Sequence, residues 1–166
     1  MSKAEKGGAK KRIKPRSDRP TISIAGHECV AGERARFEIP IARLQTDSEA
    51  SLPVCVFHGA REGPTIWTSA AVHGDELNGV EIIRRLLGEV DPLEMAGTLI
   101  AVPIVNVFGF LNQSRYLPDR RDLNRSFPGS PRGSLAARLA HIFVTEIVHR
   151  CSVGIDLHTG SDARTN

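Results

Sequence analysis

Four short apolar runs, each closed by glycine or a polar residue, limit the folds open to this chain more than any other feature. Each run is too short for a typical helix and is typical of a strand that is buried on both faces. The runs are LPVCVFHG at 52–59, TIWTSAAVHG at 65–74, GTLIAVPIVN at 97–106 and SVGIDLHTG at 152–160. A sheet made of such strands must be covered by other elements on both faces.

Between these runs the apolar residues follow a helical period. They recur at spacings of three and four between residues 80 and 90, and at a spacing of four between 135 and 147. Each pattern predicts an amphipathic helix. Alternating apolar and polar residues at 21–44 predict antiparallel strands or a hairpin. The order of elements therefore predicts an α/β domain with a mixed, mostly parallel sheet, helices on both faces and a small N-terminal β segment.

The positive charge of the chain lies mainly in residues 1–20, where eight Lys and Arg stand against two acidic residues. This segment carries six positive charges and the whole chain a formal net charge of +3, so the remainder is mildly acidic at −3. A basic segment of this kind can bind nucleic acid. No aromatic residues interleave with the lysines, which favours a solvated, disordered tail instead. We expect residues 21–166 to form one folded domain.

Composition excludes several other classes of protein. With 40% hydrophobic and 25% charged residues the chain is typical of a soluble domain. No apolar run approaches the roughly 20 residues of a membrane-spanning helix, and no secretory signal follows the basic N-terminus, so a cytoplasmic location is expected. Three cysteines without a C-x-x-C spacing indicate neither a disulfide framework nor a cysteine zinc site.

A histidine and a carboxylate stand where the second apolar run gives way to a helix. His73 and Glu76 are three positions apart, which turns both side chains toward one side. Zinc accepts such mixed ligands, and a catalytic zinc takes three protein ligands and leaves a fourth place to water. His158 is the best third candidate because it ends another strand, and Asp156 could accept its hydrogen bond. The pair alone is more typical of an ordinary turn in which Glu76 favours the helix N-terminus.

Residues 106–133 have no sustained period and contain three prolines and three glycines, which predicts a long loop. Long ordered loops in compact domains are often functional. An arginine binds a carboxylate through two parallel hydrogen bonds, and a neighbouring asparagine can read the same group. Asn124 and Arg125 are therefore candidates to bind an acidic substrate. A solvated loop of ion pairs is the alternative.

Three motifs, HGDE at 73–76, DLNRSFPG at 122–129 and DLHT at 156–159, occur in this order. Together they resemble the succinylglutamate desuccinylase/aspartoacylase family, which is related to the zinc carboxypeptidases. The resemblance runs from about residue 50 to the end of the chain. It implies that zinc is bound by His73, Glu76 and His158, that the substrate carboxylate is held by Asn124 and Arg125, and that the scissile carbonyl is polarised by Arg115.

The implied activity is zinc-dependent hydrolysis of the amide bond of a small N-acyl amino acid. The family's general-base glutamate lies well downstream of the third zinc ligand, and this chain ends at Asn166, eight residues after His158. We therefore expect residues 21–166 to be the N-terminal part of a deacylase domain, inactive alone, with an unpaired sheet edge open to self-association. The alternatives are a non-catalytic zinc-binding module and a protein that binds nucleic acid through its basic tail.

Overall fold

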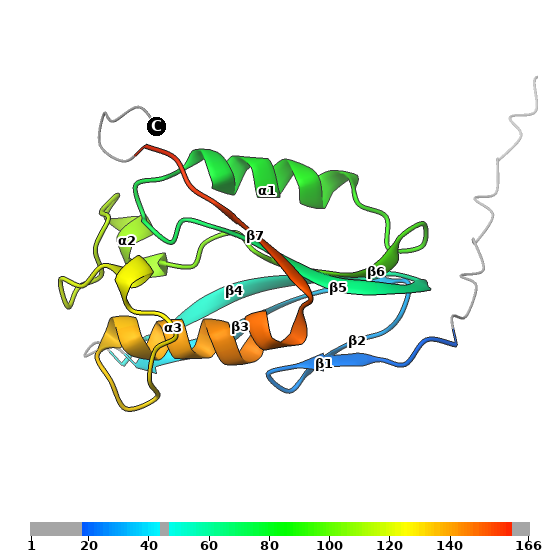
Figure 1. Cartoon of the computed structure of the whole chain (residues 1–166), viewed down its shortest axis with the longest axis horizontal. Coiled ribbons are helices and arrows are strands. Elements are labelled where there is room, and N and C mark those ends of the chain that lie inside the picture. Colours follow the sequence, from blue (N-terminus) through cyan, green and yellow to red (C-terminus); the bar gives the residue numbers. More distant parts are fainter. Residues whose placement is uncertain (1–17, 44–46, 161–166) are drawn as a thin grey trace, which may run out of the picture.

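The computed structural model describes residues 18–43 and 47–160, so almost all of the predicted basic tail lies outside the described residues. A five-stranded sheet has α1 on one face and α3 on the other (Figure 1). The elements are β1 (Ile22–Ile24), β2 (His27–Cys29), β3 (Glu33–Arg43), β4 (Glu49–His58), β5 (Arg61–Ala70), α1 (Asn78–Glu89), β6 (Ala96–Val102), α2 (Val107–Leu111), the 3-10 helix η1 (Leu123–Arg125), α3 (Leu135–Glu146), the 3-10 helix η2 (Val148–Arg150) and β7 (Val153–Leu157).

The sheet is mixed, as the sequence predicted, with strand order β3-β4-β6-β5-β7. The pairs β5/β6 and β5/β7 are parallel, whereas β3/β4 and β4/β6 are antiparallel. Parallel pairing is thus half of the sheet rather than most of it. The reason is that the predicted N-terminal β segment divides. Its first part forms the separate β1–β2 hairpin, and its second part, β3, joins the main sheet along almost the whole of β4.

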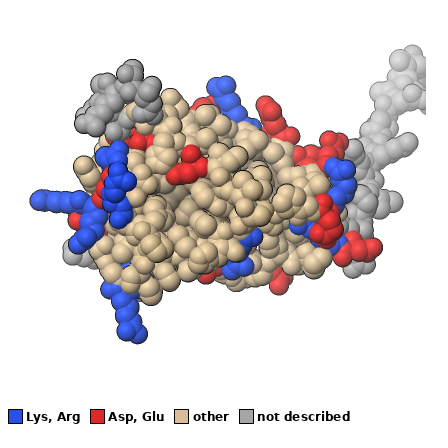
Figure 2. Space-filling model, in the orientation of Figure 1, with Lys and Arg blue, Asp and Glu red and all other residues tan. Residues whose placement is uncertain are grey.

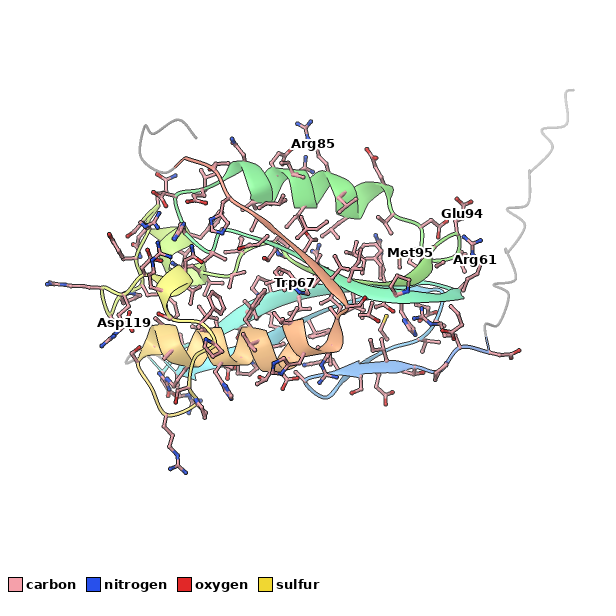
Figure 3. The ribbon with its side chains drawn as sticks, in the orientation of Figure 1. Arg61, Trp67, Arg85, Glu94, Met95 and Asp119 are labelled. Atoms are coloured by element: carbon pink, nitrogen blue, oxygen red, sulfur yellow. The ribbon has the colours of Figure 1, made fainter. Side chains whose placement is uncertain are left out.

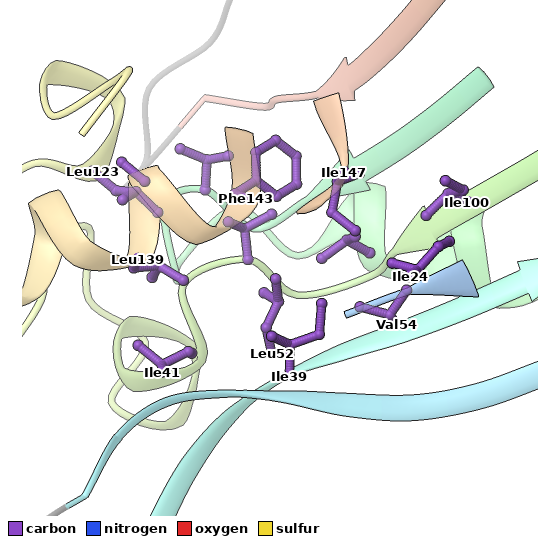
Figure 4. Packing of buried hydrophobic residues seen from close by; sticks show 14 of the residues in the cluster. Ile24, Ile39, Ile41, Leu52, Val54, Ile100, Leu123, Leu139, Phe143 and Ile147 are labelled. Carbon is purple, nitrogen blue, oxygen red and sulfur yellow. The ribbon is translucent and has the colours of Figure 1, made fainter. Parts of the chain in front are cut away.

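Alternation along the strands builds a core on each face of the sheet. In β4, Leu52, Val54 and Val56 face α3, whereas Cys55 and Phe57 face α1. The larger core lies between the sheet and α3 (Figure 4). The predicted helical periods are confirmed, because Ile83 and Leu87 of α1 and Leu139 and Phe143 of α3 are buried in these cores.

The segment 106–133 contains two short helices where the sequence predicted only a loop. The side chain of Asn106 accepts a hydrogen bond from the amide of Gly109 (2.8 Å) and begins α2. Asp122 begins η1 in the same way. Such helices are too short to show a period and depend on their capping residues instead. The carboxylate of Asp119 accepts a hydrogen bond from the amide of Ala136 (3.0 Å), which ties the loop to the start of α3 (Figure 3).

Strand β7 forms an edge of the sheet, since among the described residues it pairs with β5 alone. It crosses the viewed face between α1 and α3 in Figure 1, and its apolar residues Val153 and Ile155 are 56% and 53% exposed. Charged side chains are sparse over the middle of this face and gather toward its two ends (Figure 2). In the described part of the chain, no helix has the length and apolar character needed to span a membrane.

Candidate metal centre

Three side chains from two separate segments meet at the carboxyl ends of β5 and β7. His73 and Glu76 lie in the turn between β5 and α1, and His158 follows β7. Each offers one ligand atom, and these atoms lie within 4.8 Å of one another. Nδ1 of His73 is 2.7 Å from Oε1 of Glu76, and Nδ1 of His158 is 2.8 Å from Oε2 of the same carboxylate. The arrangement is the mixed nitrogen and oxygen set that zinc takes in catalytic sites.

Backbone contacts with the segment after β6 position the turn that carries His73 and Glu76. The amide of Asn106 donates to the carbonyl of Ala71 (2.8 Å), and the amide of Gly74 donates to the carbonyl of Ser114 (3.0 Å). A Cβ atom at residue 74 would lie 1.9 Å from the carbonyl carbon of Gly109. Glycine is therefore required at the second position of HGDE, because the turn packs directly against α2.

An aspartate accepts a hydrogen bond from the far side of each imidazole. Nε2 of His158 donates to Oδ2 of Asp156 (2.7 Å), as the sequence predicted. Nε2 of His73 donates to Oδ1 of Asp122 (3.1 Å), a contact that sequence reasoning missed. When Nε2 carries the donated proton, Nδ1 is the atom that each ring offers to a cation, and such partners also fix the ring orientation. The sequence did offer one indication of this role, because Asp122 is the first residue of the DLNRSFPG motif.

The same aspartate places Arg115 at the site. Nε and Nη2 of Arg115 donate to Oδ2 of Asp122 at 3.1 and 3.0 Å, and Nη1 lies 3.9 Å from Oε1 of Glu76. Burial raises the pKa of Asp122, but the hydrogen bonds from His73 and Arg115 outweigh it and leave that pKa below its ordinary value. Burial likewise raises the pKa of Glu76, and hydrogen bonds from the amide of Thr159 and from His73 bring it below the ordinary range. Both groups are thus carboxylates at neutral pH, as a cation site needs.

The two residues predicted to bind a substrate carboxylate lie on η1, and both are exposed. Leu123, which lies between Asp122 and Asn124 in the sequence, is fully buried in the larger core (Figure 4). Its burial holds the turn, so that Asp122 faces His73 while Asn124 and Arg125 remain at the surface. Asn124 also lines a cavity of about 210 Å³ with Trp67, Val72, Phe127, Phe143, Val148 and Asp156.

The sequence was also compared with known proteins and protein families. The model of the succinylglutamate desuccinylase/aspartoacylase catalytic domain matches residues 62–166. The chain belongs to this family. It is 36% identical over 143 residues to N-alpha-acetyl-L-2,4-diaminobutyric acid deacetylase of Halomonas elongata, a match that covers 85% of this chain and 42% of the relative. It is 28% identical to succinylglutamate desuccinylase of Pseudomonas aeruginosa, over 83% of this chain and 43% of the relative.

Solved structures of this desuccinylase/aspartoacylase family share the fold. The succinylglutamate desuccinylase/aspartoacylase of Rhodobacter sphaeroides superposes with a TM-score of 0.70 at 31% identity, covering 78% of this chain and 40% of that one. The product-bound ectoine utilization protein EutE (DoeB) of Ruegeria pomeroyi gives 0.69 at 30% identity, covering 76% and 40%. The predicted zinc carboxypeptidase-like α/β fold is thereby confirmed. The chain spans less than half the length of these relatives.

Proposed function

We propose that this chain carries the zinc-binding and substrate-binding part of a hydrolase that cleaves the amide bond of an N-acyl amino acid. One observation carries the proposal: the Nδ1 atoms of His73 and His158 converge on the two carboxylate oxygens of Glu76, at 2.7 and 2.8 Å. Three protein ligands leave the fourth position of a tetrahedral zinc to water. The two outer aspartates, which orient the imidazoles, support a metal site over an ordinary polar turn.

The residues of this chain would divide the work of hydrolysis among them. A bound zinc ion would lower the pKa of its water and polarise the scissile carbonyl. Arg115, 3.9 Å from Glu76 and oriented by Asp122, would donate hydrogen bonds to that carbonyl as charge develops on its oxygen. Asn124 and Arg125, exposed on η1, would bind the carboxylate of the amino acid.

The substrate class follows from the relatives. One is a deacetylase of an N-acetylated diamino acid and another a desuccinylase, so a short acyl group on the amino nitrogen of an amino acid is proposed here. We further propose that residues 1–166 bind zinc but do not turn over substrate alone, because the expected downstream general base has no counterpart among them. A cytoplasmic location and self-association through the edge of β7 remain predictions.

Elemental analysis of the purified chain after zinc reconstitution tests the metal site. We expect about one zinc ion per chain, the stoichiometry of a three-ligand catalytic site. His73→Ala and His158→Ala should both lose it. His149→Ala removes an exposed histidine of η2 and is the matched control, which should keep the metal. A wild-type chain without zinc, or a metal that survives both triad substitutions, would overturn the proposed function.

A further inference from the structure

We propose that Ser69 is a positioning residue of this centre, whose hydroxyl fixes the orientation of His158 through Asp156. The proposal rests on the proposed function, because it takes His158 to be a metal ligand. Ser69 lies inside β5 and is completely buried. Its hydroxyl donates to Oδ1 of Asp156 at 2.5 Å, and Oδ2 of that carboxylate accepts from Nε2 of His158 at 2.7 Å.

His158 needs such support more than the other two ligands do. Its side chain is 31% exposed, against 3% for His73 and for Glu76. It follows an edge strand that has one neighbour among the described residues, and most of that strand is exposed. An exposed imidazole keeps more rotamer freedom than a buried one, and that freedom is lost when a cation is bound. A group that orders the ring beforehand therefore raises the affinity of the site.

The strand register places Ser69 where it can do this. Ser69 and Asp156 are direct partners in the parallel pair of β5 and β7. Side chains of neighbouring strands at one register position point to the same face of the sheet. The hydroxyl thus reaches the carboxylate from the buried C-terminal end of β5 and leaves the second oxygen for the imidazole. Nδ1 of His158 then faces Oε2 of Glu76 at 2.8 Å.

The other histidine has an equivalent support. Asp122, the partner of His73, is itself held by two hydrogen bonds from Arg115. Each outer carboxylate is therefore fixed by a further donor, a guanidinium on one side and a buried hydroxyl on the other. A hydroxyl that only satisfied its own hydrogen bond would affect folding stability and leave metal affinity unchanged. Metal affinity is therefore the readout that separates the two roles.

The test is the zinc dissociation constant, measured with zinc ion alone by competition with a chelator. Ser69→Ala should weaken zinc binding about five- to tenfold. This is at or below the lower end of the roughly 10- to 100-fold loss that is typical when a direct hydrogen-bond partner of a metal-binding histidine is removed. Ser69→Thr keeps the hydroxyl and should restore most of the affinity. Thr68→Val is the matched control, since Thr68 is also buried in β5 but faces α1 and pairs with Ile155. It should bind zinc as the wild type does.

A double-mutant cycle shows whether Ser69 acts through Asp156. Asp156→Ala should weaken zinc binding about 10- to 100-fold, and adding Ser69→Ala to it should change nothing further. Additive effects, an equal loss in Thr68→Val, or wild-type affinity in Ser69→Ala would each overturn the role of Ser69 while leaving the zinc site in place. A wild-type chain that binds no zinc would instead overturn the proposed function on which this inference rests.

Discussion

Replacement of Asp122 by asparagine should weaken zinc binding close to 100-fold. The carboxylate accepts hydrogen bonds from His73 (3.1 Å) and, at 3.0 and 3.1 Å, from Arg115. Loss of an outer partner of a metal-binding histidine reduces affinity about 10- to 100-fold. The neutral amide could still accept from His73, so this contact alone predicts the lower end of that range. The size of the effect therefore depends on the group with which Arg115 pairs once Asp122 is neutral.

Without the charge of Asp122, Arg115 is free to pair with Glu76, whose Oε1 already lies 3.9 Å from Nη1. At about 4 Å, the separation that the wild type already has, opposite charges in a partly buried site attract by about 4 kcal/mol, and closing that gap to about 2.8 Å would raise the attraction to about 6 kcal/mol. A 100-fold change in affinity corresponds to only about 2.7 kcal/mol. Competition by the guanidinium for the carboxylate of Glu76 is thus large enough to move the loss to the upper end of the range.

Isothermal titration of the metal-free chain with zinc measures this loss. Adding Arg115→Met to Asp122→Asn removes the competing guanidinium, and the affinity should recover to within about tenfold of wild type. Asp119→Asn is the matched control, because Asp119 lies in the same segment but accepts from the amide of Ala136. If Asp122→Asn bound zinc like the wild type, or if the second substitution weakened binding further, the reasoning would be wrong.

Three other predictions concern stability, measured by chemical denaturation. Burial lowers the pKa of His58 below its ordinary value of 6.5, so below that pH the unfolded chain binds more protons than the folded chain does. The free energy of unfolding should therefore decrease as the pH falls below 6.5, and His58→Gln should make this decrease smaller. Gly74→Ala should destabilise by about 1–3 kcal/mol because its Cβ would collide with Gly109, whereas Gly88→Ala, with open space in α1, should stabilise by about 0.5–1 kcal/mol. Leu123→Ala should cost about 2–5 kcal/mol by opening a cavity under η1; a loss below 1 kcal/mol would refute its role in holding that turn.

Much of the fold could be predicted because it depends on local periods. The apolar runs and both amphipathic helices follow from residues within a few positions of one another, and the structure confirms them. The division of the N-terminal β segment into a separate hairpin and β3 could not be predicted from such local patterns. Whether β3 pairs with β2 or with β4 depends on contacts between segments, and the alternating pattern of 33–43 suits either neighbour.

In the candidate site, too, some features follow from local sequence and others depend on contacts between distant segments. The sequence by itself determined the spacing of His73 and Glu76, because a turn entering a helix puts residues three apart on one side. It also singled out His158 and the exposed pair Asn124 and Arg125, whose roles stay predictions.

Only the tertiary structure decided which groups support the candidate metal ligands through hydrogen bonds. Asp122 lies 49 positions from His73, and Ser69 lies 87 positions from Asp156. No local pattern links such residues. Their contacts exist because Leu123 is buried in the core and because β5 and β7 pair in one particular register. Packing and strand pairing, unlike helical periodicity, are properties of the assembled chain.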